Sequence, residues 1–119
     1  MSELLPNDMN LAVNGRTLGV DLEDVPAEDV VSGSPQQGVA ELGSIGGAEA
    51  GIWELRGGVV TDTEVDELFV VLSGSALIEF LDEDRTVEVG AGDVMRLLAG
   101  SRTRWTVEDH IRKVYISAE

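Results

Sequence analysis

Short segments suited to β-strands fill this chain from residue 38 onward, and they constrain the fold more than any other feature. These runs cover residues 39–42, 52–56, 59–63, 67–72, 76–81, 86–89, 94–98, 102–107 and 111–117. Turn-forming residues separate them, with Gly57-Gly58, Ser73-Gly74-Ser75 and Glu108-Asp109-His110 as clear examples. No segment reads as an amphipathic helix of convincing length. Many short strands at this spacing predict an all-β fold, either a sandwich or a closed barrel.

The first 37 residues depart from this pattern and predict an N-terminal arm. They alternate short apolar stretches with turn signals at Asn14-Gly15, Pro26 and Ser32-Gly33-Ser34-Pro35. We expect residues 1–37 to pack on the barrel or on a partner subunit, and residues 38–119 to form the barrel itself. A chain of 119 residues is one domain by the usual size prior, so no second domain is expected.

Composition excludes several classes of function. The net charge is −15, from 23 acidic against 8 basic residues, and a field of that sign repels nucleic-acid phosphates and anionic lipid headgroups. We therefore expect neither a nucleic-acid partner nor a membrane partner. The chain has no cysteine and one histidine, which excludes zinc–thiolate sites and sites that need two imidazoles from one chain. The first residues lack the basic and apolar regions of a signal peptide, so we expect a cytoplasmic protein.

The alternation of side chains along residues 61–72 predicts which of them face the barrel interior. Thr61, Thr63 and Glu67 fall on the face that also carries the apolar residues of the following run, and we place this face toward the cavity. The opposite face carries Leu68, Val70 and Leu72 and needs a cover. A strand that is apolar on both faces is expected where both are covered. The cover is either the N-terminal arm or a second copy of the chain, and we predict a homodimer.

Seven short pieces occur in a fixed order between residues 32 and 115. They are Ser32-Gly33-Ser34-Pro35-Gln36, Gly51-Ile52-Trp53-Glu54, residues 66–74, Gly92-Asp93-Val94, Ala99-Gly100, Trp105-Thr106-Val107 and residues 112–115. In this order the pieces resemble the (S)-ureidoglycine aminohydrolase cupin-domain family, and the chain is similar to its single-domain members. The resemblance implies a cupin-type double-stranded β-helix, that is, a jelly-roll barrel with an N-terminal arm.

The positions that hold a metal in most cupins carry unsuitable residues here. The cupin pattern has two histidines before a glutamate and a third in its second motif, and this chain has Thr61, Thr63, Glu67 and Thr103 there, with Leu98 in place of a proline. The manganese-binding members of the resembled family use Glu, His, His and Gln, which this chain does not match either. One carboxylate and three neutral hydroxyls are a poor cage for manganese, iron or zinc. We expect no metal and no other cofactor.

Glu67 is the charged residue of the predicted cavity face. Because an ionised carboxylate is costly to bury alone, we expect it to lie at the barrel mouth or to pair with Arg102, Arg104 or Lys113. The alternative is that Glu67 is an acid or base in the cavity with a raised pKa. His110 falls in a predicted hairpin turn, where we expect it to be exposed and inert.

Aromatic residues complete the set of candidate ligand-binding side chains. Trp53, Trp105 and Tyr115 suit a small-molecule pocket, although aromatic residues of this kind are more often part of an ordinary core. In the resembled family, residues at the positions of Lys113 and Tyr115 contact substrate. The candidate ligand-binding set is therefore Glu67, Thr61, Thr63, Thr103, Trp105, Trp53, Lys113 and Tyr115.

Three classes of function follow from these residues. The first is a metal-free barrel that binds a small polar metabolite. The second is an enzyme, either one that performs acid–base chemistry with Glu67 and Tyr115 or Lys113, or a ureidoglycine-type hydrolase with an atypical site. The third is a structural or regulatory dimer with a filled cavity. The sequence favours the first and leaves open whether the protein is an enzyme.

Overall fold

The architecture is all-β, as the sequence predicts. The structure, a computed structural model, describes residues 3–118. The strands are β1 (Glu23–Asp24), β2 (Val30–Ile45), β3 (Ala48–Thr63), β4 (Glu67–Phe80), β5 (Arg85–Gly90), β6 (Val94–Leu97) and β7 (Arg102–Ala118). One 3-10 turn, η1 (Ala27–Asp29), precedes β2. Within the described residues no helix is long and apolar enough to cross a membrane.

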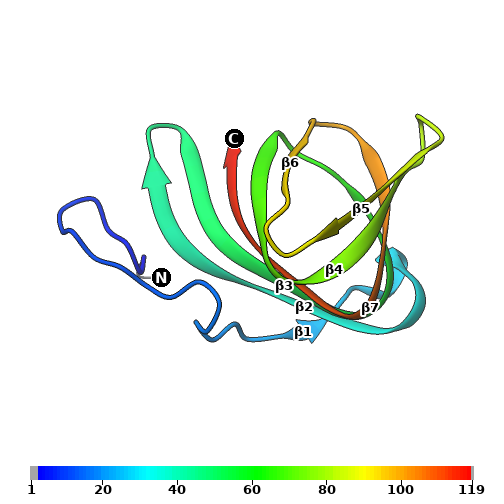
Figure 1. The fold of residues 1–119 in the computed structure, drawn as a ribbon, viewed down its shortest axis with the longest axis horizontal. Coiled ribbons are helices and arrows are strands. Elements are labelled where there is room, and N and C mark those ends of the chain that lie inside the picture. Colours follow the sequence, from blue (N-terminus) through cyan, green and yellow to red (C-terminus); the bar gives the residue numbers. More distant parts are fainter. Residues whose placement is uncertain (1–2, 119) are drawn as a thin grey trace.

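The strands form one antiparallel sheet that curls on itself. Its order is β1-β2-β3-β7-β4-β5, and β6 pairs with β4 at the edge of the same sheet. The first half of β4 lies between β6 and β7, and its second half lies between β5 and β7. Figure 1 shows the result, with β4, β5, β6 and β7 wrapped around an interior and the long β2–β3 hairpin extending away from it. This arrangement confirms the predicted cupin jelly roll.

Three predicted turns are wrong, because the strands continue through them. Gly57 lies within β3 and Gly74 within β4, and both adopt left-handed backbone angles, with φ of 50° and 76°. The pairing register shifts at these places, between Arg56 and Gly58 and on both sides of Gly74. A left-handed glycine serves a β-bulge as well as a turn, and a bulge bends a strand without ending it. The third predicted turn, residues 108–110, lies within β7.

The core fills the closed end of the barrel. Its fully buried side chains include Leu55, Ile78, Leu97 and Ile111, and they come from four different strands. Each strand contributes alternate side chains to the core, and a bulge bends its strand. The two stretches on either side of a bulge therefore contribute side chains to different walls of the core. The remaining interior, toward Trp105, is lined by polar as well as apolar side chains.

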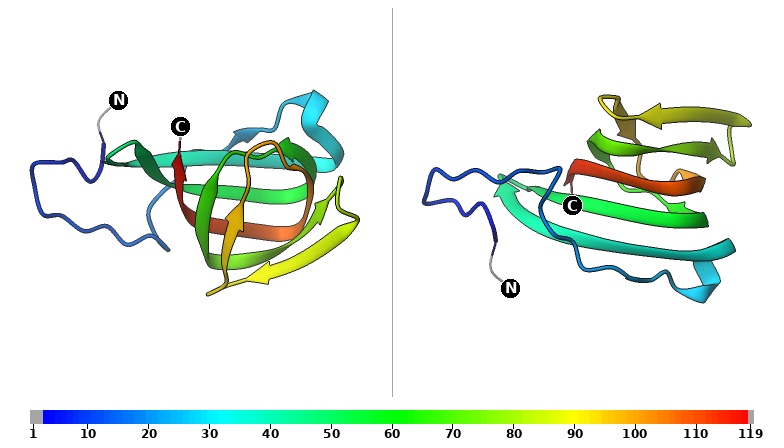
Figure 2. Two further views of the ribbon diagram at one scale, coloured as in Figure 1. Left: turned by 90° about the horizontal axis from the view of Figure 1, so that it is seen from above. Right: turned by 60° about the horizontal axis from the view of Figure 1, so that its bottom comes forward.

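The N-terminal arm runs along the outside of the sheet (Figure 2). Leu5 donates its backbone N–H to Leu42 at 2.7 Å, and Gly15 lies against the side chains of Leu72 and Ile52. The arm therefore covers one end of the predicted outer apolar face, while Leu68 at the other end stays 48% exposed.

The arm is shorter than the sequence indicates. Residues 30–37, which we assigned to it, form the first part of β2. The glycine and proline in this segment look like loop residues in the sequence, but the strand accommodates them where its register shifts, between Val30 and Ser32 and between Gly33 and Gln36.

Candidate functional site

The open end of the barrel holds a cavity of about 320 Å³. Its walls come from β2, β3, β4 and β7, with Asp29 of η1 at one side. Seven of the eight candidate residues line it, namely Glu67, Thr61, Thr63, Trp105, Trp53, Lys113 and Tyr115. The fold therefore brings together side chains that lie up to 62 positions apart in the chain, from Trp53 to Tyr115.

Lys113 is the central residue of this cavity. Its ammonium group lies 2.6 Å from Oε2 of Glu67, and both side chains are buried. The same nitrogen lies 4.7 Å from the ring centre of Trp53, 4.5 Å from that of Phe69 and 5.0 Å from that of Trp105. These distances are typical of cation–π contacts, so three rings and one carboxylate surround the ammonium group. Of the three partners expected for Glu67, the structure selects Lys113.

Glu64 is a second buried carboxylate of the cavity, and the sequence analysis did not identify it as a candidate. Its Oε2 accepts hydrogen bonds from the Thr103 hydroxyl at 2.6 Å and from the Trp105 indole N–H at 3.0 Å. Its backbone is fixed by two further bonds, from Glu64 N–H to Ser101 and from Gly100 N–H to Glu64, both 2.8 Å. The residue is 7% exposed and lies in the short link between β3 and β4.

Asp62 and Tyr115 titrate abnormally because of their surroundings. Asp62 keeps contact with solvent, but the surrounding protein removes part of its hydration, and together with the charge of Glu64 this raises its pKa to about 6. Burial, assisted by the carboxylate of Glu67, raises the pKa of the Tyr115 phenol. Tyr115 fits only because its neighbour on β3 is Gly51, where a Cβ would lie 2.5 Å from the phenol oxygen.

The predicted alternation of residues 61–67 is interrupted. On β3, Val60 and Asp62 lie opposite Trp105 and Thr103 and share their interior face. The alternation does not carry over to Glu67, because β3 ends at residue 63 and the link of residues 64–66 is not part of a strand. Thr61 and Thr63 therefore belong to the rim, where the Thr61 hydroxyl donates to the backbone oxygen of Asp29 at 3.4 Å.

Thr103 does not line the main cavity, although its neighbours do. Its side chain is fully buried, and its hydroxyl donates to Glu64. Thr103 thus holds the carboxylate of Glu64 in position without lining the cavity itself. Arg102 and Arg104, the other expected partners of Glu67, instead pair on the outside of the barrel with Asp82 and Glu79.

The cavity residues do not fit a transition metal. Among residues 3–118, no three His, Cys, Asp or Glu side chains are placed to hold one ion together. The one suitable donor of the four cupin positions, Glu67, is already bound to the ammonium group of Lys113. A metal ion at Glu67 would have to displace a fixed positive charge, and the neutral hydroxyls nearby offer it little in return.

Comparison with known proteins agrees with this geometry. A family model described as the EutQ-like cupin domain matches residues 42–115, which contain most of the strands of the cavity. The chain belongs to the EutQ-like cupin family. The narrower assignment to the ureidoglycine aminohydrolase family is not part of that match. None of the curated proteins matches the chain in sequence.

Solved structures of several other proteins share the fold of this EutQ-like chain. The EutQ protein of Clostridium difficile is 20% identical, with 81% of this chain and 80% of that chain covered and a TM-score of 0.63. A putative ethanolamine utilization protein Q from Salmonella typhimurium is 18% identical, with 86% and 97% covered and a TM-score of 0.62. A protein of unknown function from Pseudomonas syringae pv. tomato is 18% identical, with 85% and 45% covered and a TM-score of 0.72. At these identities the likeness establishes the fold alone.

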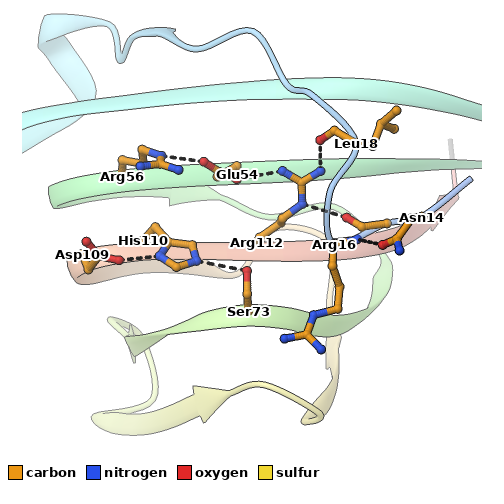
Figure 3. Close-up of polar contacts among 10 residues, drawn as sticks. Asn14, Arg16, Leu18, Glu54, Arg56, Ser73, Asp109, His110 and Arg112 are labelled. Atoms are coloured by element: carbon orange, nitrogen blue, oxygen red, sulfur yellow. Dashed lines mark hydrogen bonds and ion pairs between the residues drawn. The ribbon is translucent and has the colours of Figure 1, made fainter.

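A second polar cluster lies on the opposite face of this EutQ-like sheet, beneath the arm (Figure 3). Arg112 donates to Glu54 at 2.9 Å, to the backbone oxygen of Gly15 at 2.8 Å and to that of Leu18. Arg56 binds the same glutamate at 2.6 Å. Burial opposes ionisation of Glu54, but its hydrogen bonds with Arg56 and Arg112 outweigh burial and lower its pKa. This cluster fixes the arm to the barrel.

His110 also lies on this side, and its predicted place in an exposed hairpin turn is wrong. It lies within β7, with hydrogen bonds to Ser73 at 3.0 Å and to Asp109 at 2.5 Å (Figure 3). The order serine, histidine, aspartate is that of a hydrolase triad. However, the Asp109 side chain is 89% exposed, and neither Ser73 nor His110 lines the cavity around Lys113 or either of two further hollows among the described residues. The Ser73–His110 contact links β4 to β7 at the bulge.

Proposed function

We propose that this cupin is a metal-free barrel that binds a small polar metabolite in the cavity around Lys113. The observation that carries the proposal is the buried Lys113–Glu67 ion pair, which faces an open volume of about 320 Å³. That volume is at the lower end of the range of small-molecule sites, about 300–1,000 Å³. A cavity of this size next to fixed charges and aromatic faces is the usual form of such a site.

The energetics of the ion pair favour a binding role over a purely structural one. A buried ion pair is often no more stabilising than apolar residues of the same volume, because both groups lose their hydration. Most of the buried interior is already filled by apolar side chains, among them Leu55, Ile78 and Leu97, which stabilise the barrel without any charge. A filled, structural interior, the third class of function, would be built more simply from that apolar core.

Recovery of a bound metabolite tests the proposal directly. The purified protein would be unfolded, and the released small molecules identified by mass spectrometry. The two tryptophans of the chain, Trp53 and Trp105, both line the cavity, so their fluorescence reports rebinding. We expect one compound in near-stoichiometric amount that rebinds to the wild type and to Glu88→Gln, an exposed residue on β5, but not to Lys113→Met. The proposal fails if no compound is recovered and no fraction of a cell extract changes the fluorescence.

An enzyme related to the ureidoglycine aminohydrolases is the second candidate. The observation in its favour is that Lys113 and Tyr115, whose counterparts contact substrate in that family, lie in one cavity. Such a hydrolase would need a metal at Glu67. Elemental analysis after dialysis against a weak chelator decides between the two: stoichiometric manganese lost in Glu67→Gln would favour the hydrolase, and its absence would favour the metal-free barrel.

Pairing of two chains is part of the proposal. The exposed Leu68 lies opposite Ile116 on β7, which is 53% exposed, so the uncovered end of the outer face is a continuous apolar surface. A second copy would cover it and keep the abundant carboxylates at the rim. Light scattering at moderate salt should give about twice the chain mass of 12.7 kDa. A monomeric mass, or a dimer that survives Val70→Asp, would contradict pairing through this face.

A further inference from the structure

The charges that line the cavity are strongly unbalanced. Among residues 3–118, four carboxylates line it, from Asp29, Asp62, Glu64 and Glu67, against one ammonium group, that of Lys113. With all of them ionised, four negative charges face one positive charge, which leaves −3. A recess of this sign concentrates cations and repels anions. A phosphate or a dicarboxylate is therefore a poor occupant.

Glu64 offers a defined place for a positive group. Both donors that reach it, the Thr103 hydroxyl and the Trp105 indole, are neutral and bind the same oxygen, Oε2. Among the described residues, no ion pair neutralises this buried carboxylate. Because a buried carboxylate is stabilised most by a cation that also donates a hydrogen bond, an ammonium group at Oε1 would supply what the protein itself does not.

Lys113 offers the complementary place for an oxygen. An ammonium group has three N–H donors, and Glu67 accepts one of them. The three rings around the nitrogen hold it in position by cation–π contacts and contribute no acceptor oxygen. The remaining N–H groups can donate to an acceptor in the cavity. This fixed positive group is what separates the site from a simple cluster of acidic side chains.

We propose that the ligand is a small ammonium compound with a carbonyl oxygen, its ammonium group bound by Glu64 and its oxygen bound by Lys113. The inference rests on the proposed function and narrows it to one chemical class. Asp62 at the mouth adds attraction for the same positive group. Trp53 and Tyr115 supply the apolar sides of the pocket for the carbon skeleton.

A matched series of four small molecules tests the two contacts separately. Glycinamide carries both groups, ethylamine only the ammonium group, acetamide only the carbonyl, and acetate a negative charge. Binding would be followed at pH 7 by tryptophan fluorescence and by ligand-observed NMR. We expect glycinamide to bind most tightly, with ethylamine and acetamide each about tenfold weaker for the loss of one charge-assisted hydrogen bond, and acetate not at all.

Two variants assign the contacts to residues. Glu64→Gln keeps the shape and an acceptor for Thr103 and Trp105, so the fold should be preserved. It should weaken glycinamide and ethylamine about tenfold and leave acetamide unchanged, while the exposed control Glu88→Gln changes nothing. Lys113→Met should weaken glycinamide and acetamide and spare ethylamine. Thermal melts of each variant confirm that the protein measured is folded.

The outcomes separate this inference from the proposed function. Acetate or acetamide bound as tightly as glycinamide would overturn the ligand class and leave a metabolite-binding barrel in place. Equal binding of ethylamine and glycinamide would overturn the contact with Lys113. Calcium or manganese bound through Glu64 would overturn the ammonium assignment in favour of a metal. If none of the probes binds, the ligand class is wrong, and the recovered metabolite alone then decides the proposed function.

Discussion

Arg112 and Lys113 are neighbours on β7, and they point to opposite faces of the sheet, each into a buried ion pair. On the outer face, the Arg112 guanidinium binds Glu54 and two backbone oxygens of the arm, so its planar donors are largely used by the protein. On the inner face, the Lys113 ammonium binds one carboxylate and is otherwise surrounded by aromatic rings beside an open cavity. The two residues differ in their free hydrogen-bond donors: Arg112 has few left, whereas Lys113 keeps N–H groups that face the cavity.

The surroundings of the carboxylates differ in the same way. Outside, two arginines share Glu54, and their hydrogen bonds lower its pKa against the effect of burial. Inside, several carboxylates share one lysine, and Asp62 has a raised pKa through burial and the charge of Glu64. A buried carboxylate that arginines of the protein itself neutralise belongs to the structure, whereas carboxylates that outnumber the cations at a cavity leave negative charge for a ligand to neutralise. The comparison teaches that burial of an ion pair does not by itself distinguish a structural site from a functional one.

The largest effect is expected from removing the outer arginine. Arg112→Met leaves Glu54 buried with only the partly exposed Arg56, and it removes the two contacts that hold the arm. Breaking a buried ion pair on one side costs several kcal/mol, so we expect the free energy of unfolding in urea to fall by about 3 kcal/mol.

Limited proteolysis provides the readout specific to the arm. Cleavage near residues 14–18 should accelerate in Arg112→Met more than the loss of global stability alone explains. Arg85→Met, an exposed arginine on β5 far from the arm, is the matched control. An arm that stays protected in Arg112→Met would show that the apolar contacts of Gly15 with Leu72 and Ile52, and not the guanidinium, hold it.

A smaller loss of stability is expected when the inner ion pair is broken. Lys113→Met leaves Glu67 without its partner, but the adjoining cavity can admit water to the carboxylate, so we expect a loss of about 2 kcal/mol, below the usual value for a closed core. The double variant Lys113→Met/Glu67→Gln should recover most of it. The same treatment of the outer pair, Arg112→Met/Glu54→Gln, should recover less, because the arm contacts are still lost.

A double-mutant cycle on each pair therefore sharpens the comparison. Full recovery on both faces would mean that the arm contacts of Arg112 add little. No recovery on the inner face would mean that Lys113 stabilises the barrel mainly through Trp53, Phe69 and Trp105, and not through Glu67.

The sequence predicted the fold class and most of the inner face, for a physical reason. Strand alternation and turn chemistry are local properties, so an all-β barrel could be inferred from them. Side chains alternate regularly along two stretches of β7, one before the bulge and one after it. This alternation brings Trp105 of the first stretch together with Lys113 and Tyr115 of the second. The pairing of Glu67 followed from the cost of burying a carboxylate alone, which limited its partners to a few cations.

Features that depend on register or on breaks in alternation could not be predicted in the same way. A left-handed glycine looks the same whether it ends a strand or bulges it, so Gly57 and Gly74 were interpreted as turns. Glu64 lies in the link between β3 and β4, where alternation has no meaning, and Thr61 and Thr63 were placed toward the cavity because the alternation was carried across this link. The contact of Arg112 with the arm joins residues 97 positions apart, and no local pattern encodes it.

The smallest expected effect concerns Asp62 and pH. Its pKa in the folded protein, about 6, is higher than the ordinary 3.8, so between pH 4 and 6 the folded state binds more protons than the unfolded state. Stability from this group is therefore present at low pH and is lost as the pH rises toward 6. Replacing Asp62 by Asn removes this pH dependence. The free energy of unfolding of the variant should therefore rise relative to that of the wild type between pH 4 and pH 6.

We expect the gain to reach about 1 kcal/mol at pH 7, less than the shift alone implies, because solvent reaches Asp62 and screens its charge. Urea unfolding of both proteins at pH 4, 5, 6 and 7 measures it, and Glu88→Gln on the outer strand should run parallel to the wild type. A cationic ligand supplies the same relief, so saturating glycinamide should shrink the advantage of Asp62→Asn at pH 7. If the two proteins keep a constant difference at every pH, the inner face is not short of positive charge, and the contrast with Glu54, which two arginines neutralise, is lost.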